Sequence, residues 1–244
     1  MKSPRILFFD IETRYIVFRG WRTGKQYVDQ GQIVLGQDSD IICISYKFLG
    51  DKEVHTLDWG LKKQDSKQMI EAFSKVVESA DLCVGHNADS FDIRHINTQR
   101  LIHRQPPIAW PQSEDTLKQI RRMFYLPSYR LDYVSKLLLG EGKKPTDFQL
   151  WVDVVEGKDR KALDKLIAYN RNDVLILEKD YKILAPYLKP KIHAGIVNDK
   201  GKDSCPRCGG REYRSKGVKY LVASRYRARQ CKGCGSQYRG ERIS

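Results

Sequence analysis

The sequence has no apolar run long enough to cross a membrane. No stretch approaches the roughly 18 consecutive apolar residues that mark a transmembrane helix. The first residues, MKSPRILFFDIET, are acidic where a signal peptide would have its cleavage region. We therefore expect a cytoplasmic protein. The chain also lacks internal repeats and low-complexity tracts.

Cysteine is scarce and unevenly placed. Cys43 and Cys83 stand alone in apolar, strand-like segments and are expected to be reduced core residues. The other four form two Cys-x-x-Cys pairs, Cys205/Cys208 and Cys231/Cys234. Because four thiolates favour tetrahedral Zn²⁺ and disulfides are improbable in the cytoplasm, we expect one structural zinc ion. The module resembles a zinc ribbon, whose residues between the pairs form β-strands.

Positive charge is concentrated near the C-terminus. The net charge is +14, and residues 189–244 carry 15 Lys and Arg against 4 Asp and Glu, whereas residues 1–188 carry 29 against 26. A basic module beside a nearly neutral body indicates a polyanionic partner, with nucleic acid as the first candidate. A solvated surface that only aids solubility is the alternative.

Apolar periodicity indicates an α/β fold. Residues 5–11, RILFFDI, are apolar on both alternating faces, which is typical of a central strand covered on both sides. Segments 41–49 and 53–59 are also expected strands, and the apolar spacing over 65–79 predicts an amphipathic helix. Because mostly helical patterns follow between about 115 and 185, we predict a mixed sheet flanked by helices.

These patterns divide the chain into three parts. We predict an α/β domain over 1–187, a polar and basic linker over 188–203, and the cysteine module over 204–244. Residues 14–40 fit either an insertion or an extended strand pair. Their basic and aromatic side chains, such as Arg22 and Trp21, suit either contact with a single nucleic-acid strand or an ordinary surface hairpin.

Four carboxylates are candidates for one site. Asp10 and Glu12 lie two apart on a predicted strand, so both point to the same face. Asp92 stands where a strand ends and a helix begins, while Tyr169 and Asp173 are four apart and share a helix face. Gathered carboxylates repel one another unless metal ions neutralise them. Oxygen ligands favour Mg²⁺ or Mn²⁺, and two such ions can cleave a phosphodiester.

Three motifs in a fixed order carry a specific resemblance. They are Asp10-x-Glu12, Asn87-x-x-x-Phe91-Asp92 and Tyr169-x-x-x-Asp173. Together they resemble the exonuclease motifs of the DEDD superfamily, most closely the proofreading domain of family B DNA polymerases. Ala168 stands where the histidine subclass has its histidine, so the chain looks like the DEDDy subclass. The resemblance covers residues 1–185 and implies a ribonuclease H-like 3′→5′ exonuclease that releases nucleoside monophosphates.

The resemblance also implies roles for these residues. Asp10, Glu12 and Asp173 would hold the metal ion that carries the attacking water. Asp10 would bridge to a second ion, which Asp92 supports. Tyr169, whose ordinary pKa of about 10 keeps it neutral, would orient the water.

The second motif contains further candidates. Asn87 and Phe91 would shape the strand-to-helix corner and grip the terminal nucleotide of the substrate. His86 and His95 flank the motif, and we interpret them as structural or near phosphate, not as metal ligands.

Other interpretations remain open at this level. Asp92 could be a first-turn acid favoured by the helix dipole, and Asp173 a surface acid beside Arg171. Single-stranded DNA is the expected substrate, with RNA as the alternative. A structure-selective endonuclease or a non-catalytic nucleic-acid-binding protein would use the same fold. A bacterial or phage-infected cell would suit a compact nuclease of this kind.

The cysteine module carries a candidate binding strand. Alternation would place Arg225, Arg227 and Arg229 on one face, as a basic stripe suited to phosphates. The alternatives are a solvated edge strand kept from aggregating by its charges, or a ribbon that docks a replication or repair protein.

Overall fold

The computed structural model describes residues 3–25, 27–34, 36 and 40–243. The strands are β1 (Ile6–Thr13), β2 (Ile41–Phe48), β3 (His55–Asp58), β4 (Leu82–Gly85), β5 (Gln112–Asp115), β6 (Tyr213–Leu221), β7 (Ser224–Cys231) and β8 (Gln237–Ile243). The helices are α1 (Lys67–Glu78), α2 (Asp92–Ile102), α3 (Thr116–Met123), α4 (Leu131–Leu139), α5 (Phe148–Val155), α6 (Arg160–Leu184) and α7 (Ala194–Val197), with a 3₁₀ turn η1 (Gln30–Gln32). No helix within these ranges combines the length and apolarity needed to span a bilayer.

Five strands form a mixed sheet in the order β3-β2-β1-β4-β5. The first three strands pair antiparallel, while β4 is parallel to both β1 and β5. The predicted mixed α/β sheet is therefore confirmed, and the predicted strands and amphipathic helix are β1, β2, β3 and α1 within a few residues. Cys43 and Cys83 are fully buried in it.

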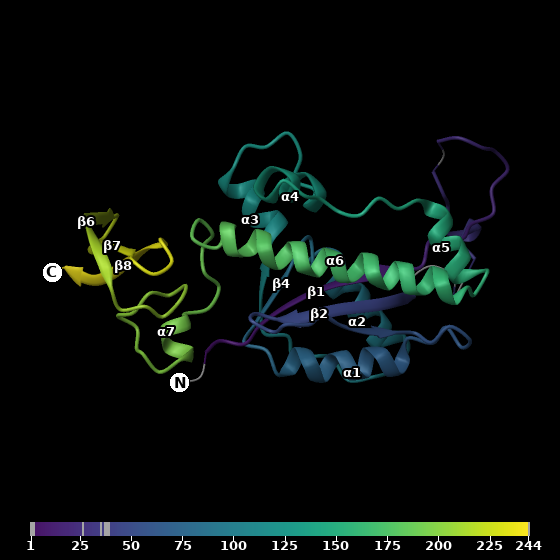
Figure 1. Ribbon diagram of the computed structural model, residues 1–244, viewed down its shortest axis with the longest axis horizontal. Helices are drawn as coiled ribbons and strands as arrows, with labels where there is room; N and C mark the ends of the chain where they lie inside the picture. The colour runs from purple at the N-terminus through teal and green to yellow at the C-terminus, as the bar shows by residue number, and fades with distance from the viewer. Residues whose placement is uncertain (1–2, 26, 35, 37–39, 244) are drawn as a thin grey trace.

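β1 is the central strand and its two faces meet different helices. Phe9 faces α1, where its ring lies 5.5 Å from that of Phe73. Phe8 faces the long helix α6, where its ring lies 5.2 Å from that of Tyr181. In Figure 1, α6 and α1 accordingly cover opposite sides of the sheet. Because side chains alternate along a strand, Asp10 and Glu12 share the α6 face with Phe8.

The described residues of segment 14–40 protrude at the end of the molecule opposite the C-terminal strands (Figure 1). Within the described part of this segment, an antiparallel bridge joins Phe18 to Ile33. The Tyr15 hydroxyl donates to Glu156 at the end of α5 (2.5 Å), which anchors the base of the loop. Of the two interpretations, the strand pair agrees better with this short bridge, and Trp21, between the bridged residues, is 98% exposed.

The C-terminal residues form a separate three-stranded antiparallel sheet in the order β6-β7-β8. The expected linker contains the one-turn helix α7, whose Ala194 N–H donates to the Pro206 carbonyl (2.8 Å). The linker therefore packs on the first cysteine pair instead of running free between the two sheets.

Candidate active site and cysteine centre

Three carboxylates from β1 and α6 meet on the α6 face of the sheet. Asp10 and Glu12 lie opposite Ser45 and Cys43 of β2, at the carboxyl end of β1. Asp173, which is 0% exposed, lies next to them and comes from the middle of α6. One oxygen from each of the three lies within 4.8 Å of the others. The alternative of Asp173 as a surface acid is therefore wrong.

Asp92 reaches the same place from the other side of β1. It is the first residue of α2, and its Oδ1 accepts the Ile11 N–H (3.2 Å), between the two β1 acids. The corner before α2 makes this possible. Asn87 has φ +72°, and a Cβ on Gly85 would overlap the Ala88 side chain, so the chain turns tightly out of β4.

The acids strongly perturb one another. Burial, together with the neighbouring carboxylates, raises the pKa of Asp10 well above its usual range and that of Glu12 to about 8. Burial raises the pKa of Asp92 to about 7, and it raises the pKa of Asp173 as well. Removing water from several acids in one place makes their ionised forms costly, unless cations join them.

The donor set fits a hard divalent cation. All the converging ligands are carboxylate oxygens, which suit Mg²⁺ or Mn²⁺. Asp173 Oδ1 is buried and has no hydrogen-bond partner among the described residues. A buried carboxylate oxygen without a donor is what a metal ligand would leave in the protein alone.

Two residues that the sequence did not single out complete the site. The Asn170 side-chain amide donates to Asp10 Oδ2 (2.7 Å). Lys143, in the loop before α5, donates its Nζ to the Asp173 carboxylate and to the Tyr169 hydroxyl (3.3 Å). Contact with Asp173 and proximity to Asp10 raise the pKa of Lys143 despite its burial. The site therefore contains its own fixed positive charge.

Tyr169 lies at the rim of this cluster. Burial and the Asp173 carboxylate raise the pKa of its phenol to about 12, so the hydroxyl stays protonated near neutral pH. Its ring packs against Trp151 of α5, with centroids 6.2 Å apart. The hydroxyl is thus held beside Asp173 as a neutral hydrogen-bonding group.

Comparison with known proteins agrees with this geometry. The sequence model of one protein family, the RNase_H superfamily, matches residues 34–185, which are more than half of the chain. The chain belongs to the RNase H superfamily. Asp10 and Glu12 precede the matched residues, but their strand pairs with β2 and β4 inside the matched range. A search of the curated proteins finds no match.

A solved structure shares the fold of this RNase H superfamily member. The family B DNA polymerase from the hyperthermophilic archaeon Pyrobaculum calidifontis aligns with a TM-score of 0.57 and 15% identity. The alignment covers 76% of this chain and 25% of the polymerase chain, so the chain spans about a quarter of that polymerase. The predicted ribonuclease H-like fold and the resemblance to family B polymerases are confirmed, and a nuclease is the class of enzyme they support.

The second motif of the RNase H-like domain is mainly architectural. Asn87 receives a hydrogen bond at its carbonyl from Phe91 N–H (3.0 Å), which closes the corner. Phe91 remains 39% exposed and its ring lies 4.4 Å from that of His95. His86 lies within hydrogen-bond distance of Thr116 and the Tyr129 carbonyl, and among the described residues it bonds none of the four site acids. These bonds favour the structural one of its two predicted roles, whereas the contact of Asn87 and Phe91 with a nucleotide stays a prediction.

The four cysteines outside the RNase H-like domain form a second centre. Cys205 Sγ lies 3.6 Å from Cys234 Sγ, and Cys208 Sγ lies 3.5 Å from Cys231 Sγ. All four sulfurs lie within 4.8 Å of one another. A ZnS₄ tetrahedron with bonds of about 2.3 Å has sulfur–sulfur edges of about 3.8 Å. The thiols therefore fit a zinc ion, and the described cysteines form no disulfide.

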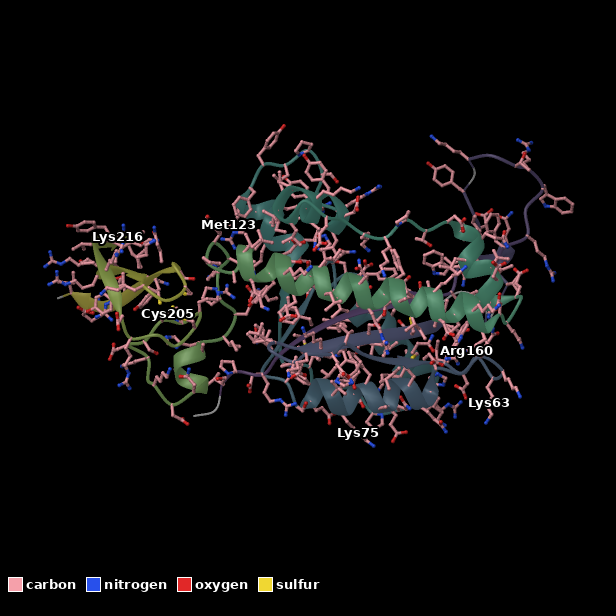
Figure 2. All side chains as sticks on the ribbon, in the orientation of Figure 1. Lys63, Lys75, Met123, Arg160, Cys205 and Lys216 are labelled. Carbon is pink, nitrogen blue, oxygen red and sulfur yellow. The ribbon has the colours of Figure 1, made fainter. Side chains whose placement is uncertain are left out.

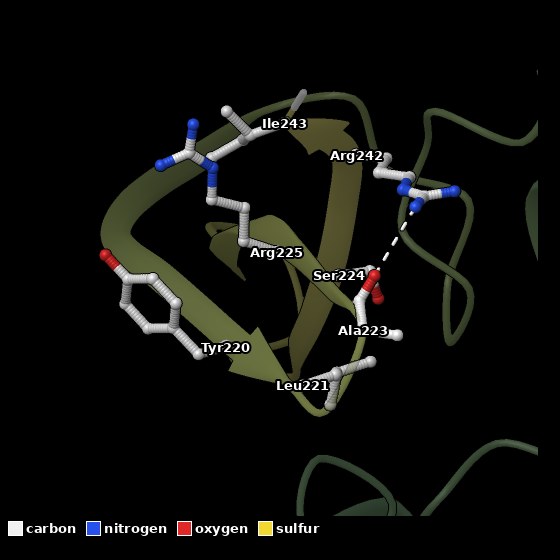
Figure 3. Close-up of a pocket in the computed structure, with 7 residues that line it drawn as sticks. All are labelled: Tyr220, Leu221, Ala223, Ser224, Arg225, Arg242 and Ile243. Carbon is white, nitrogen blue, oxygen red and sulfur yellow. Dashed lines mark hydrogen bonds between the residues drawn. The ribbon is translucent and has the colours of Figure 1, made fainter.

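The arginines of β7 are less available than the stripe interpretation supposes. Arg227 and Arg229 both pair with Glu241 of β8, which agrees with one shared strand face. Arg229 is only 8% exposed, lies over the Tyr213 ring and donates to the Asp203 carbonyl. Its role as a phosphate-binding residue stays a prediction, and the contacts of its guanidinium inside the module leave little of it exposed. Figure 3 shows Arg225 at the hairpin tip, on the other side from Arg242, which donates to the Ala223 carbonyl (3.5 Å).

Proposed function

We propose that the protein is a metal-dependent 3′→5′ exonuclease that degrades DNA, preferably single-stranded. The observation that carries this proposal is the meeting of Asp10, Glu12 and Asp173 within 4.8 Å, with Asp92 bonded to β1 beside them. The RNase H superfamily membership supports a nuclease, and the Tyr169 position supports the DEDDy subclass.

Each acid has a distinct place in this proposal. Asp10, Glu12 and Asp173 would hold one Mg²⁺ or Mn²⁺ ion, while Asp10 and Asp92 would hold a second. When bound, such ions would supply activation of a water molecule and stabilisation of the leaving oxygen of a phosphodiester. The water oxygen would bond to phosphorus as the bond to the 3′ oxygen breaks, and the proton lost by the water would be balanced by one taken up by the 3′ oxygen, so that the products are a nucleoside 5′-monophosphate and a shortened strand with a 3′-hydroxyl.

The remaining side chains position these groups. Asn170 holds the Asp10 carboxylate in one orientation through its amide. The protonated Tyr169 hydroxyl, fixed beside Asp173, would orient the attacking water by a hydrogen bond. Lys143 bonds the Asp173 carboxylate and lowers its pKa, which favours the ionised form that a metal ligand needs. Exposed Phe91 lies where it could stack on the terminal base.

Oligonucleotide cleavage tests this function. DNA and RNA strands of one sequence, each labelled at the 5′ end, are incubated with the protein and Mg²⁺ or Mn²⁺. We expect a ladder of DNA products that shortens from the 3′ end. Asp173→Asn should abolish it, because the ion loses a charged ligand, while strand binding persists. Tyr169→Phe should slow cleavage less severely.

A matched control lies on the same helix. Asp164 of α6 is exposed and pairs only with Arg160 at the surface, so Asp164→Asn makes the same chemical change away from the site. It should cleave as the wild type does. Shortening of RNA alone would overturn the DNA assignment, and a single internal cut would overturn the exonuclease assignment. No cleavage with either ion would leave a binding protein.

A further inference from the structure

A basic groove lies between the RNase H-like domain and the C-terminal sheet, away from the acids. Its volume is about 1270 Å³, and it is lined by α3, the end of α6, the linker, the second cysteine pair and all three C-terminal strands. In Figure 2, Met123 marks its domain side and Cys205 lies across from it in the cysteine module. Seven lysine and arginine side chains line the groove, and no described lining residue is an aspartate or a glutamate.

Most of this charge is unneutralised. Five of the basic side chains are exposed and form no ion pair with another described residue; they are Arg122, Lys189, Lys191, Lys219 and Arg239. The other two are engaged, because Lys118 pairs with Asp89 (2.9 Å) and Arg229 with Glu241. Tyr187 adds a ring that is 61% exposed and held edge-on against Phe124. Uncompensated cations beside an exposed aromatic ring suit a single nucleic-acid strand.

Two exposed cations of the groove lie on the face of β7 opposite to Arg225 and Arg227. In the strand register, Lys219 of β6 lies opposite Tyr226 of β7, and Arg239 of β8 lies opposite Ala228. Both side chains therefore lie on the face of the even-numbered β7 residues. Arg239 also lies over the Tyr226 ring, 5.4 Å from its centroid. Arg225 and Arg227 alternate to the other face. The two faces of the C-terminal sheet therefore each carry at least two exposed cations, of which Arg227 is already paired with Glu241.

The walls of the groove are fixed to each other by one buried ion pair. Arg207, between the first two cysteines, binds Glu114 of β5 with two hydrogen bonds of 3.0 Å. It also donates to the Tyr181 hydroxyl (2.7 Å) and the Leu188 carbonyl (2.8 Å). A bidentate pair of this kind sets orientation as well as contact. The groove is thus a defined cleft between two docked parts.

We infer that this groove binds the sugar-phosphate backbone of a single strand whose 3′ end is in the active site, an inference that rests on the proposed function. Ile183 of the groove is ten residues beyond Asp173 on α6, or about 15 Å along the helix. At a stacked rise of about 3.4 Å per nucleotide, the groove would meet the strand four to five nucleotides from its 3′ end. A trinucleotide could reach the acids but not the groove.

Charge reversal on each face of β7 separates this inference from a general effect of charge. The full-length Asp173→Asn protein is titrated with a fluorescent DNA dodecanucleotide and with a trinucleotide. Lys219→Glu with Arg239→Glu changes the groove, and Arg122→Glu with Lys189→Glu changes its opposite wall. Arg225→Glu with Arg227→Glu makes the same charge change on the other face, and it tests the arginine stripe as the rival binding surface. Zinc content and circular dichroism check that each variant folds.

We expect both groove variants to weaken dodecanucleotide binding by about tenfold and to reduce its salt slope by about 1.4, the value for two phosphates. Trinucleotide binding should not change, and the control pair should alter dodecanucleotide binding less than twofold. Equal weakening by the control pair, or no weakening by the groove pairs, overturns the groove.

Cleavage assays distinguish a failure of the groove inference from a failure of the proposed exonuclease function. In the background with Asp173 intact, groove variants should hydrolyse the trinucleotide at the wild-type rate and the dodecanucleotide more slowly at low concentration. A protein that binds strands through the groove yet cleaves none would overturn the exonuclease alone. Normal cleavage with binding that does not depend on the groove would overturn the groove alone.

Discussion

Asp173 is buried between carboxylates that oppose its charge and a lysine that supports it. Burial raises its pKa, whereas contact with Lys143 and Tyr169 acts in the opposite direction. Among the described residues, the Lys143 ammonium is therefore the cation that favours the ionised form of Asp173. Lys143 has two opposite effects on the site: it orders Asp173 through Oδ2, and its charge repels a metal ion that would bind Oδ1 of the same carboxylate.

Replacing Lys143 should separate these effects. In Lys143→Met, loss of the fixed charge should lower the cleavage rate by about 10- to 100-fold, since one preorganised donor near the reacting phosphate is removed. Because the competing ammonium is gone, Mn²⁺ should bind at least as tightly as in the wild type. Single-turnover cleavage and Mn²⁺ titration by electron paramagnetic resonance measure the two quantities.

The neighbouring Lys144 supplies the control. It is exposed, and Lys144→Met should leave both the rate and Mn²⁺ binding unchanged. Weaker Mn²⁺ binding in Lys143→Met would show that the ammonium only supports the carboxylates and does not compete for them.

His86 carries the pH dependence that the structure makes most explicit. Its Nε2–H donates to the Tyr129 carbonyl (2.8 Å), and its Nδ1 lies 2.9 Å from the Thr116 hydroxyl, which also reaches the Gly85 carbonyl (3.1 Å). Burial lowers its pKa to about 4, despite nearby Asp115. The unfolded chain, with a pKa of about 6.5, binds the proton first, so the free energy of unfolding falls as pH falls below 6.5.

The expected loss between pH 7 and pH 5 is about 2 kcal/mol. Because His86→Gln cannot titrate, its free energy of unfolding should fall less than that of the wild type over this range. The two proteins should therefore differ less at pH 5 than at pH 7. Urea unfolding at both values measures the difference, and parallel pH curves would contradict a neutral buried ring.

Single residues also show where sequence reasoning stops. Asp10, Glu12, Asp92 and Asp173 could be predicted because strand and helix periodicity align them with recurring motifs. Nothing in GEGKKPTD distinguishes Lys143 from the lysine that follows it. Its position depends on contacts between distant segments, since the Lys143 N–H donates to Asp132 (2.9 Å) of α4.

At the scale of elements, α6 connects the two parts of the molecule. Its middle provides Tyr169, Asn170 and Asp173, while Tyr181 near its end bonds Arg207 of the first cysteine pair. The helix was predicted from its length and apolar spacing. Strand β5 was not predicted, because its sequence QSED has no apolar residue.

Strand β5 is buried through polar bonds instead. Glu114 is 0% exposed because Arg207 binds both of its oxygens. Asp115 caps α3 through the Lys118 N–H (3.2 Å) and accepts the Asn87 N–H (3.1 Å). Each acid is satisfied by a partner remote in sequence, and hydrophobic patterning contains no sign of such partners.

The Arg207–Glu114 pair should be a main determinant of stability. Arg207→Met leaves Glu114 buried without its cation, and we expect a loss of about 3–5 kcal/mol in the free energy of unfolding. Adding Glu114→Gln should restore part of it, because a neutral amide tolerates burial better. Urea unfolding measures both, with Arg211→Met as an exposed arginine control in the same module. Equal losses of unfolding free energy in Arg207→Met and Arg211→Met would contradict the role of the Arg207–Glu114 pair.

At the scale of the whole molecule, the acids and the cysteine centre lie in different parts joined by this ion pair. The cysteine module therefore stabilises the RNase H-like domain only through the contacts by which the two parts dock. If the module detaches, water reaches Glu114 and its carboxylate is hydrated. The cost of losing Arg207 thus cannot exceed the free energy of undocking, and removal of the whole cysteine module gives a direct measure of that limit.

Deletion of residues 189–244 should therefore leave a domain that unfolds cooperatively and is destabilised about as much as Arg207→Met or more. Because the acids lie on β1, α2 and α6, the truncated domain should hydrolyse a trinucleotide at the full-length rate. It should lose the preference for longer strands and much of the salt dependence, since Lys189, Lys191, Lys219 and Arg239 are gone. Rates on oligonucleotides of increasing length measure this, and a preference for long strands that survives truncation would place strand binding within residues 1–188.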